Sequence, residues 1–565
     1  MKNIIGLNAI GFNTSACIMI NGKIKAAIEE ERLSRSKRTR LFPEKSIDYC
    51  LKTCGLKIDD IDAIAISWNP LINLEKFDKF QSRNLSYLPN ILHSALNHII
   101  KNKKINEKYF NQTLLLKKKK IEIFFIKHHL CHASMVYLSN FSNSGIVTTD
   151  GFGEKESSTL ATFKKFKINE INENFFPHSL GSFYSTFTEY CGFTPQSEEW
   201  KLMGASSYTK NENLYKKLKN LVELKPKGKF ELDLNYFNHY QFHRPNYYNN
   251  ELIDYLNVEP RSNDKKPMNK KYFDIANSAQ RVFEDVYFHQ IKYLKNISNS
   301  QNLVVSGGCA MNCVANGKIS KNTGFKNIFV SPVPDDSGAC LGAASYLVNE
   351  IRNQKKKIYI KDYYLGPSFS NKEIELKLKK YQIKYKHIKN IEKHAAKEIS
   401  TGKIIAWFQG QLEFGDRALG NRSILADPRS RKIKDLINKK IKFREKFRPF
   451  APAILKEFSN EYFEENQLSN YMELALKFKK QVINKIPGVV HVDQTGRLQT
   501  VDKKYNLKFY NLINEFFKIT KIPLILNTSF NIQGEPIVCS IEDAIKNFYL
   551  SGLDKMYIGD FEISK

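Results

Sequence analysis

The sequence has few of the features that mark secreted or membrane-spanning proteins. Its 565 residues include nine cysteines, an odd number without a Cys-x-x-Cys pair, which favours buried, reduced thiols over a disulfide framework. No apolar run approaches the roughly 20 residues that a membrane helix needs. The opening MKNIIGLNAIGF lacks the longer apolar core and small-residue cleavage site of a signal peptide. These absences predict a globular, cytoplasmic protein without a membrane span.

Acidic residues are scarce relative to basic ones. The chain has 58 Asp and Glu against 88 Lys and Arg, a formal net charge of +30. Such a charge attracts nucleic acid, anionic membranes or anionic small substrates. It is also what an AT-rich genome produces without any function, since lysine, asparagine and isoleucine are all abundant. The run Lys117 to Lys120 is interpreted as a solvated helix face or loop, and nucleic acid is disfavoured as a partner.

The length and the pattern of strands indicate an α/β protein of more than one domain. Three strand–turn units carry Gly or Asp at the turn, in the segments 145–163, 302–319 and 330–347. This arrangement is typical of the two-lobed nucleotide cleft of the actin and sugar-kinase class. A Lys-rich stretch ending in Gly366-Pro367 is the predicted domain boundary. We expect one domain at 1–355, with a charged helical insertion at 67–120, and a second at 366–565.

Two histidines four residues apart suggest a metal site. His128 and His132 fall in the helical pattern KHHLCHASMVYLSN, and on a helix this spacing places both rings on one face. Asp150 and Asp336, each in a loop after a strand, would add oxygen ligands. Nitrogen and carboxylate ligands with open positions suit Fe2+ or another divalent transition metal. The alternative is a histidine pair that caps its helix or makes a polar contact.

Arginines in the C-terminal part suggest an anion site. Arg417 and Arg422 lie beside glycines in GQLEFGDRALGNRSILADPR, and further basic residues follow: Lys442, Arg444, Arg448 and Arg497. Guanidinium groups bind phosphate in a bidentate manner, so several of them in one pocket would suit a triphosphate or an acyl phosphate. Asn527 and Ser529 stand where a predicted strand ends. The alternative is surface charge, but flanking Gly, Pro, Phe and Ala favour a cleft.

Ten segments in chain order resemble the O-carbamoyltransferases of the NodU/CmcH/TobZ type over nearly the whole chain, the insertion at 67–120 excepted. They are EEERLSRSKRTRLFP, HHLCHA, DGFGEKES, EEWKLMGA, SGGCAMNCVANGKI, PDDSGACLGAA, EFGDRALGNRSILADPR, KFREKFRPFAPAIL, HVDQTGRLQTV and NTSFNIQGEPIV. The resemblance implies an N-terminal two-lobed, actin/sugar-kinase-like (TsaD-like) domain followed by a C-terminal YrdC-like α/β domain. It also implies that the C-terminal domain joins carbamoyl phosphate to ATP, with Mg2+, and that the N-terminal domain transfers the carbamoyl group from carbamoyladenylate to a hydroxyl.

The resemblance also implies roles for particular residues. The metal ligands would be His128, His132, Asp150 and Asp336. The predicted catalytic residues are Lys37, Asp150, Arg417, Arg448 and Arg497. Basic and polar residues that would bind the substrates are Lys201, Arg417, Lys442, Arg448, Arg497, Asn527 and Ser529. Gly307, Gly308 and Asn312 fall in the block that would bind adenosine.

Two positions depart from the pattern of this family. Many relatives have His-Asp-Ser-Ala in the first turn, where the histidine is a candidate base for the acceptor hydroxyl, and this chain has Asn13 there. An asparagine side chain cannot take that proton, so another group, such as an acid in the cleft, acts as base, or the acceptor is more acidic, or transfer is impaired. Asp416 replaces a usual proline and would either tether Arg417 or oppose the binding of anions.

Other functions remain open on the sequence alone. A tRNA threonylcarbamoyl transferase uses the same pair of folds, and a nucleotide- and metal-binding regulatory protein without transfer is a second alternative. The expected acceptor is a hydroxyl of a sugar or secondary metabolite, and the sequence is compatible with a monomer and with a homodimer.

Overall fold

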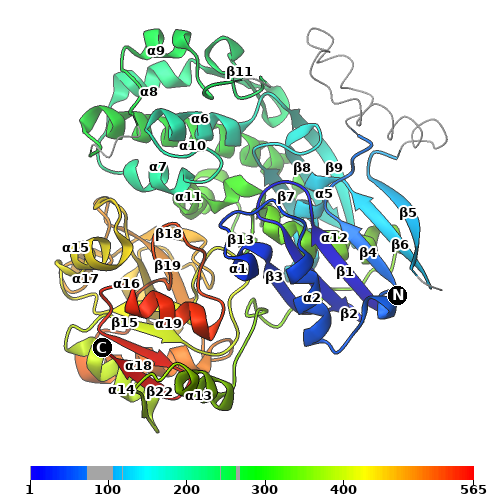
Figure 1. The fold of residues 1–565 in the computed structure, drawn as a ribbon. Helices are drawn as coiled ribbons and strands as arrows, with labels where there is room; N and C mark the ends of the chain where they lie inside the picture. The colour runs from blue at the N-terminus through cyan, green and yellow to red at the C-terminus, as the bar shows by residue number, and fades with distance from the viewer. Residues whose placement is uncertain (1, 73–105, 117–118, 242–243, 263–266) are drawn as a thin grey trace.

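The computed structural model describes residues 2–72, 106–116, 119–241, 244–262 and 267–565. Within these residues the strands form sheets of six, five, two and nine strands. The six- and five-stranded sheets belong to the N-terminal part, and the nine-stranded sheet belongs to the C-terminal part (Figure 1). We call the bodies around the first two sheets the first lobe and the second lobe.

The first lobe is built on the order β3-β2-β1-β4-β6-β5. Its strands are β1 (Asn3–Asn8), β2 (Ser15–Ile20), β3 (Lys23–Glu29), β4 (Ala63–Ile66), β5 (Tyr109–Leu116) and β6 (Lys119–Ile126). Strands β1 to β3 form an antiparallel meander, and β4 and β6 continue parallel to β1. Apolar side chains fill these strands, as the sequence pattern predicts for a sheet with covered faces. Helices α1 (Glu30–Ser34) and α2 (Glu44–Thr53) follow β3.

The second lobe repeats this topology. Its sheet has the order β13-β12-β7-β8-β9, made of β7 (Asn143–Thr149), β8 (Glu156–Lys164), β9 (Lys167–Phe175), β12 (Asn302–Ser306) and β13 (Asn327–Val330). Again the first three strands form an antiparallel meander, and the next two run parallel to the first of them. Two sheets of matching topology in one chain define the two-lobed actin and sugar-kinase architecture, so the predicted fold class is confirmed.

Two helices lie between the lobes and position the metal site. They are α5 (His128–Ala133) and α12 (Ala339–Tyr346), which belong to one apolar core with strands of both sheets. Small residues let these elements approach closely. A Cβ built on Gly6 of β1 would lie 2.1 Å from the Cys340 carbonyl oxygen, and one on Gly342 would lie 1.8 Å from the Cys131 carbonyl oxygen. Helix α12 is therefore wedged against both β1 and α5.

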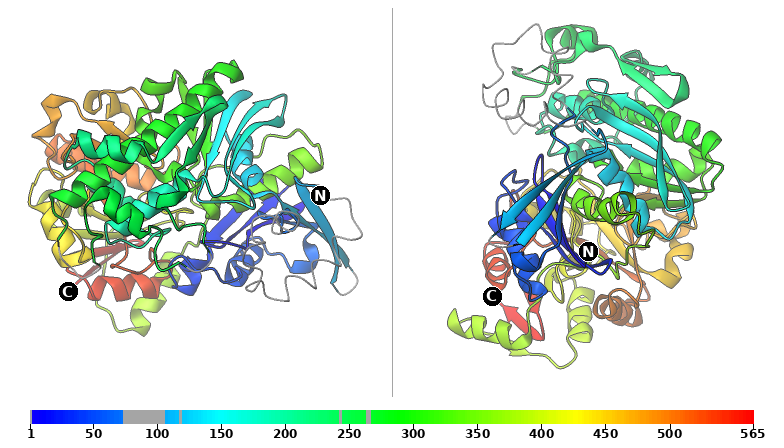
Figure 2. Two further views of the ribbon diagram at one scale, coloured as in Figure 1. Left: turned by 90° about the horizontal axis from the view of Figure 1, so that it is seen from above. Right: turned by 90° about the vertical axis from the view of Figure 1, so that its right-hand side faces the viewer.

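The remaining helices of the second lobe cover its sheet and form the side that meets the C-terminal part (Figure 2). They are α6 (Leu180–Tyr190), α7 (Glu199–Ala205), α8 (Glu212–Lys219), α9 (Asn250–Leu256), α10 (Lys270–Ser298) and α11 (Cys313–Thr323), with the hairpin β10 (Val222–Lys225) and β11 (Lys229–Leu232). Asn269 and Asn312 accept backbone hydrogen bonds at the starts of α10 and α11, as N-cap residues do.

The C-terminal part is a mixed sheet of order β14-β22-β21-β15-β16-β20-β17-β19-β18. Its strands are β14 (Lys386–His387), β15 (Ile405–Phe408), β16 (Arg422–Ala426), β17 (Ala451–Leu455), β18 (Leu474–Lys477), β19 (Thr495–Val501), β20 (Leu524–Ser529), β21 (Lys555–Ile558) and β22 (Phe561–Ser564). Its helices are α13 (Asn371–Lys380), α14 (Ile391–Ser400), α15 (Ile433–Ile437), α16 (Ser459–Tyr462), α17 (Lys480–Ile483), α18 (Leu507–Thr520) and α19 (Ile541–Tyr549).

The C-terminal part packs against both lobes. With the second lobe it shares one continuous apolar core, and a Cβ on Gly317 of α11 would lie 2.1 Å from the Ala475 carbonyl oxygen of β18. With the first lobe it meets at Gly415, whose N–H donates to Glu29 Oε1 (2.7 Å) and whose carbonyl accepts from Arg32 Nη2 (2.8 Å). The predicted boundary at 355–366 remains a prediction; part of that stretch runs beside β3, where Ile24 N–H donates to the Tyr359 carbonyl (3.0 Å).

Several expectations need correction or lie outside the described residues. Residues 109–116 form β5 rather than part of a helical insertion, because Tyr109–Leu116 pairs with β6 in an antiparallel hairpin. Residues 73–105 and Lys117 and Lys118 lie outside the described part. Lys119 opens β6, so this end of the lysine run is strand rather than helix or loop.

Eight of the nine cysteines are buried, and Cys54 is half-buried. Every helix in the described ranges is too short or too polar to cross a bilayer.

The contact between α12 and α5 provides a test of the fold. Gly342→Ala should destabilise the protein by about 1–3 kcal/mol, because the new methyl group overlaps a backbone carbonyl that cannot simply rotate away. The measurement is the midpoint of thermal unfolding. Ser345→Ala in the same helix is the control, since it removes only the hydrogen bond from Ser345 Oγ to the Leu341 carbonyl (2.7 Å). Equal midpoints for the two variants would contradict the packing described here.

Candidate active site

Four side chains from four segments converge between the lobes. His128 and His132 lie on α5, Asp150 follows β7, and Asp336 precedes α12. One ligand atom from each lies within 4.8 Å of those from the other three. His132 Nε2 is 3.0 Å from His128 Nε2 and 3.1 Å from Asp150 Oδ2, and His128 Nε2 is 3.5 Å from Asp336 Oδ1. The structure thus brings together all four predicted metal ligands.

The hydrogen bonds of the two rings favour a cation between them. His128 Nδ1 faces the Ser67 carbonyl oxygen at 3.1 Å, which assigns the ring proton to Nδ1 and a lone pair to Nε2. His132 Nδ1 faces Ser306 Oγ at 3.3 Å. The two Nε2 atoms lie 3.0 Å apart, so a proton on one of them or a metal ion between them is needed to avoid repulsion between their lone pairs. The two carboxylates add negative charge at the same point, so these residues fit a divalent cation.

The contacts between these histidines and carboxylates also shift their pKa values. Burial opposes charge on Asp150, but hydrogen bonds with His128 and His132 outweigh it and hold its pKa well below the usual range. Burial disfavours charge on His128 too, and the two carboxylates nevertheless raise its pKa well above the usual value. His129 differs, because burial and the two other histidines lower its pKa, and its Nδ1 bonds to Thr148 Oγ1 at 2.8 Å. The carboxylates therefore stay ionised and attract either protons or a metal.

Glycines let the loops reach the ligands. Gly307 has φ +90°, and a Cβ there would lie 2.3 Å from the Thr149 carbonyl oxygen; a Cβ on Gly308 would lie 2.9 Å from Asp150 Oδ1. The amide of Asn312 exchanges two hydrogen bonds with Gln280, at 2.9 and 3.1 Å, and also accepts from Ala315 N–H. The block predicted to bind adenosine therefore lies against the loop of Asp150.

A cavity of about 280 Å³ opens onto the metal ligands. Asp150, Asp336, Gly308 and Asn312 contribute to its wall. Most of the remaining wall is aromatic or apolar, from Ile10, Phe12, Trp68, Phe152, Tyr184, Trp200, Met203, Phe283 and Met311. We call this space the metal cavity.

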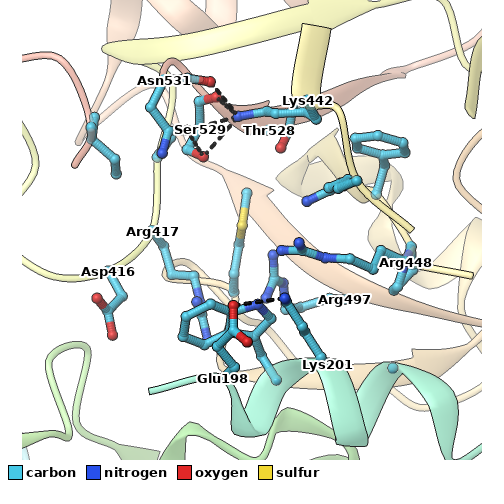
Figure 3. A pocket seen from close by; sticks show the side chains of 18 of the residues that line it. Glu198, Lys201, Asp416, Arg417, Lys442, Arg448, Arg497, Thr528, Ser529 and Asn531 are labelled. Atoms are coloured by element: carbon cyan, nitrogen blue, oxygen red, sulfur yellow. Dashed lines mark hydrogen bonds and ion pairs between the residues drawn. The ribbon is translucent and has the colours of Figure 1, made fainter. Parts of the chain in front are cut away.

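A second cavity, of about 340 Å³, lies between both lobes of the N-terminal part and the C-terminal part and is lined by basic side chains (Figure 3). They are Arg32, Lys37, Arg38, Lys201, Arg417, Lys442, Arg444, Arg448 and Arg497. We call it the basic cavity. The basic residues predicted for substrate binding all lie in its wall, as do Asn527 and Ser529.

The predicted arginines face one another across the basic cavity. Arg417, Arg448 and Arg497 point toward the same space in Figure 3. Burial, together with Arg417, lowers the pKa of Arg497 to about 10. Arg448 Nη1 lies 3.5 Å from Glu445 Oε2, and Glu198 is a second carboxylate near it. Cationic groups that are buried with few counter-charges are suited to polyanionic ligands.

Two lysines of this cavity are engaged with protein oxygens. Lys201 Nζ lies 2.6 Å from Glu198 Oε1 and 3.2 Å from Glu445 Oε1. Lys442 Nζ lies 2.5 Å from the Ser529 carbonyl oxygen and 2.7 Å from Asn531 Oδ1, as Figure 3 shows. Burial and the neighbouring arginines hold the pKa of Lys442 well below the usual range. Lys442 thus fixes the end of β20, where Ser529 enters the cavity wall.

Arg422 does not belong to the anion site. It is fully buried, its guanidinium donates to the carbonyls of Gln409 (2.6 Å) and Pro367 (3.0 Å), and it stacks 3.7 Å from the Phe408 ring centroid. On the sequence alone, Arg422 was grouped with Arg417 because both lie beside glycines. Arg422 is the first residue of β16, however, and its side chain points into the domain interior. Its role is to satisfy main-chain carbonyls beneath the cavity.

The two cavities adjoin. Four side chains line both of them, and these are Arg38, Trp200, Met203 and Arg417. Arg38 and Trp200 were not singled out from the sequence, although both lie in segments that resemble the carbamoyltransferases. Lys37 Nζ and the Arg38 guanidinium lie 5.4 and 5.3 Å from the Trp200 ring, an arrangement that orders both cations at the junction.

The two positions that depart from the family pattern lie near this junction. Asn13 has φ 54° and its Nδ2 donates to Asp335 Oδ2 at 3.1 Å. Burial, together with Asp416, raises the pKa of Asp335 to about 7. Burial opposes charge on Asp416 as well, but Arg38 and Arg417 outweigh it and lower its pKa. Asp416 is therefore an ionised counter-charge for the two arginines that line both cavities.

The chain thus combines a two-lobed fold, a cluster of potential metal ligands in the cleft between the lobes and a basic cavity against a second α/β part. Comparison with known proteins identifies the class. The family model described as the carbamoyltransferase N-terminus matches residues 3–345, and the carbamoyltransferase C-terminus matches residues 396–565. The chain belongs to the carbamoyltransferase family and is an enzyme of that class.

The chain is also similar to individual proteins. The chain is 34% identical to the uncharacterized protein sll1178 of Synechocystis sp., over 100% of this chain and 97% of that protein. It is 33% identical to the nodulation protein NolNO of Sinorhizobium fredii, over 99% of this chain and 80% of that protein. Among solved structures, component A of the (R)-2-hydroxyglutaryl-CoA dehydratase of Acidaminococcus fermentans matches 61% of this chain and 97% of its own, with 15% identity and a TM-score of 0.33.

The metal site leads to a direct prediction. The protein should bind about one divalent transition metal ion per chain, and His132→Ala should weaken binding at least 10-fold, because the ion loses one of two nitrogen ligands. Affinity should fall as the pH falls, since protons on His128 and His132, whose pKa values are raised, must leave before the metal binds. Calorimetric titration with Fe2+ or Zn2+ measures both effects. His387→Ala, at an exposed position on β14, is the control; equal affinity in both variants would contradict the site.

Proposed function

We propose that the protein is an ATP-dependent O-carbamoyltransferase that works in two steps, one in each cavity. In the basic cavity, carbamoyl phosphate, ATP and one water molecule, with Mg2+, give carbamoyladenylate, pyrophosphate and phosphate. In the metal cavity, the carbamoyl group passes from this mixed anhydride to a hydroxyl of a sugar or secondary metabolite, and AMP leaves. Fe2+ or another divalent transition metal would be bound by His128, His132, Asp150 and Asp336.

The charge of the basic cavity supports the first step. Carbamoyl phosphate and ATP together carry several negative charges, and the cavity collects cationic side chains from both parts of the chain. Arg417, Arg448 and Arg497 face its centre, where they would bind phosphoryl oxygens and stabilise charge that develops on them. Their burial strengthens these interactions, because water screens them less.

The donor set of the metal cavity supports the second step. A bound metal ion would act there as a Lewis acid on the adenylate and offset charge on the carbamoyl group. Arg38 and Arg417 line this cavity too, where they would hold the phosphate of the adenylate. The aromatic and apolar wall excludes water from the anhydride and presents ring faces to an acceptor.

The observation that carries the proposal is the junction of the two cavities. A mixed anhydride hydrolyses in water, so a path that does not cross solvent protects it. Side chains of Arg38, Trp200, Met203 and Arg417 line both spaces, and the two arginines would accompany the anionic intermediate from one to the other.

The first test is pyrophosphate release from ATP by the purified protein, with carbamoyl phosphate present or omitted. The proposal requires release that depends on carbamoyl phosphate. Release only with threonine and bicarbonate would instead assign the protein to the threonylcarbamoyl branch, and release under neither condition would contradict adenylate formation.

Variants should separate the two steps. Arg417→Ala should lower carbamoyl-phosphate-dependent ATP–pyrophosphate exchange by at least 100-fold, because the phosphates lose a buried guanidinium. His132→Ala should abolish carbamoyl transfer and leave the exchange within about threefold of the wild type. The readouts are labelled pyrophosphate incorporation and carbamoylated product.

The exposed Arg431, at a position outside both cavities, supplies the control Arg431→Ala, which should behave as the wild type. Equal loss of both activities in Arg417→Ala and His132→Ala would contradict the assignment of the steps to separate sites.

A further inference from the structure

The proposed transfer needs a base, and position 13, where many relatives have a histidine, does not provide one in this chain. A sugar hydroxyl must lose its proton as the new O–C bond forms, and the side chain of Asn13 has no basic group. The carboxylates nearest the junction are already engaged. Asp335 accepts hydrogen bonds from Ser337 Oγ at 2.5 Å and from Asn13 Nδ2 at 3.1 Å. Asp150 and Asp336 are the oxygen ligands of the metal site.

One carboxylate in the metal cavity has a free oxygen. Glu199 begins α7 and lines the metal cavity. Its Oε1 accepts hydrogen bonds from Ser185 Oγ at 2.6 Å and from Gln196 N–H at 2.5 Å. The main-chain N–H of Glu199 itself also bonds to this carboxylate. Among the described residues, Oε2 has no hydrogen-bond partner from another residue and no ion-pair partner. Oε1 therefore holds the carboxylate in place while Oε2 remains accessible from the cavity.

We propose that Glu199 is the general base for the acceptor hydroxyl, a role that rests on the function proposed above. Glu199 Oε2 takes the proton of the hydroxyl as its oxygen attacks the carbamoyl carbon of carbamoyladenylate. The new O–C bond gives the carbamate ester, and the bond from the carbamoyl carbon to the bridging phosphate oxygen breaks with its electron pair on AMP. The proton on Glu199 then passes to solvent, which restores the carboxylate.

The surroundings of Glu199 suit this task. Burial raises its pKa, while the hydrogen bonds at Oε1 and the charge of Arg38 hold the shift back. A carboxylate with a raised pKa is a stronger base than one in water and is still ionised above that pKa. Four titratable or charged groups of the described residues interact with it: Arg38 from the loop after α1, Tyr184 from α6, Tyr247 before α9 and Cys309 near Gly308. Burial raises the pKa of Tyr184, Tyr247 and Cys309, so these three are neutral neighbours.

Glu199 and its neighbour Glu198 contribute to different sites. Glu198 Oε1 lies 2.6 Å from Lys201 Nζ in the basic cavity, so its charge is paired with a cation. Glu199 makes no ion pair among the described residues and lies in the wall shared with Tyr184 and Phe283. At the start of α7, Glu198 is thus held in an ion pair, and Glu199 is available for the reaction.

The test compares two nucleophiles in the full-length, metal-loaded protein supplied with ATP and carbamoyl phosphate. Methanol requires removal of a proton to react, whereas hydroxylamine attacks activated acyl groups without a base. Glu199→Gln should lower enzyme-dependent methyl carbamate formation by at least 100-fold and lower hydroxyurea formation by less than about threefold. Glu199→Asp should recover part of the methyl carbamate rate. Glu212→Gln, at an exposed residue paired with Arg281, should match the wild type.

The pH profile gives a second readout. The wild-type rate with methanol should fall as the pH drops through the pKa of the Glu199 carboxyl, because the protonated form cannot accept a proton. The hydroxylamine rate, expressed per unprotonated hydroxylamine, should not show this dependence. Methyl carbamate formation by Glu199→Gln at the wild-type rate would overturn the role of Glu199, and so would equal loss with both nucleophiles. Pyrophosphate release is measured in parallel, and its absence in the wild type would instead overturn the proposed function.

Discussion

The two cavities depend on how the first lobe holds the main chain of Gly415. Glu29 accepts from its N–H and Arg32 donates to its carbonyl, at 2.7 and 2.8 Å. Gly415 has φ +116°, a conformation that residues with a Cβ rarely adopt. The next residues along the chain are Asp416 and Arg417, which line the basic cavity, and Arg417 also lines the metal cavity. The contact therefore fixes where a side chain of the C-terminal part enters the cleft of the N-terminal part.

Charge is arranged around this contact so that buried cations have nearby counter-charges but stay available to ligands. Arg32 pairs with Glu31 at 2.7 Å. Arg38 and Arg417 instead have Asp416 as their neighbour, and these two arginines lower the pKa of Asp416. A proline at position 416 would leave the two arginines without this charge. Asp416 therefore reduces the cost of burying them in the empty cavity. The wider excess of lysine on the chain is not needed for this arrangement.

Local patterns in the sequence were sufficient to predict the cluster of His128, His132, Asp150 and Asp336 and the strand–glycine units. The His128 and His132 spacing fixes both rings on one helix face, and glycine runs such as Gly307-Gly308 mark loops that pass close to other backbone. The pairing of β5 with β6 was missed because the lysine run obscured the strand pattern between them. Arg422 was misplaced because glycines flank both it and Arg417, whereas Arg422 begins β16 and is buried in the domain interior and Arg417 lies in the loop before that strand. The places of Arg38 and Glu199 in the cavity walls result from contacts between distant segments, which local sequence patterns do not reveal.

The central claim is that carbamoyladenylate forms in one cavity and reacts in the other without leaving the protein. The most direct measurement is a pulse–chase experiment: the protein is mixed with ATP and carbon-labelled carbamoyl phosphate without acceptor, chased with excess unlabelled carbamoyl phosphate, and passed rapidly through a gel-filtration column. The account predicts about one labelled carbamoyl group per chain that stays with the protein and is transferred when a nucleophile is added. Label that elutes free, or is diluted by the chase before transfer, would contradict it.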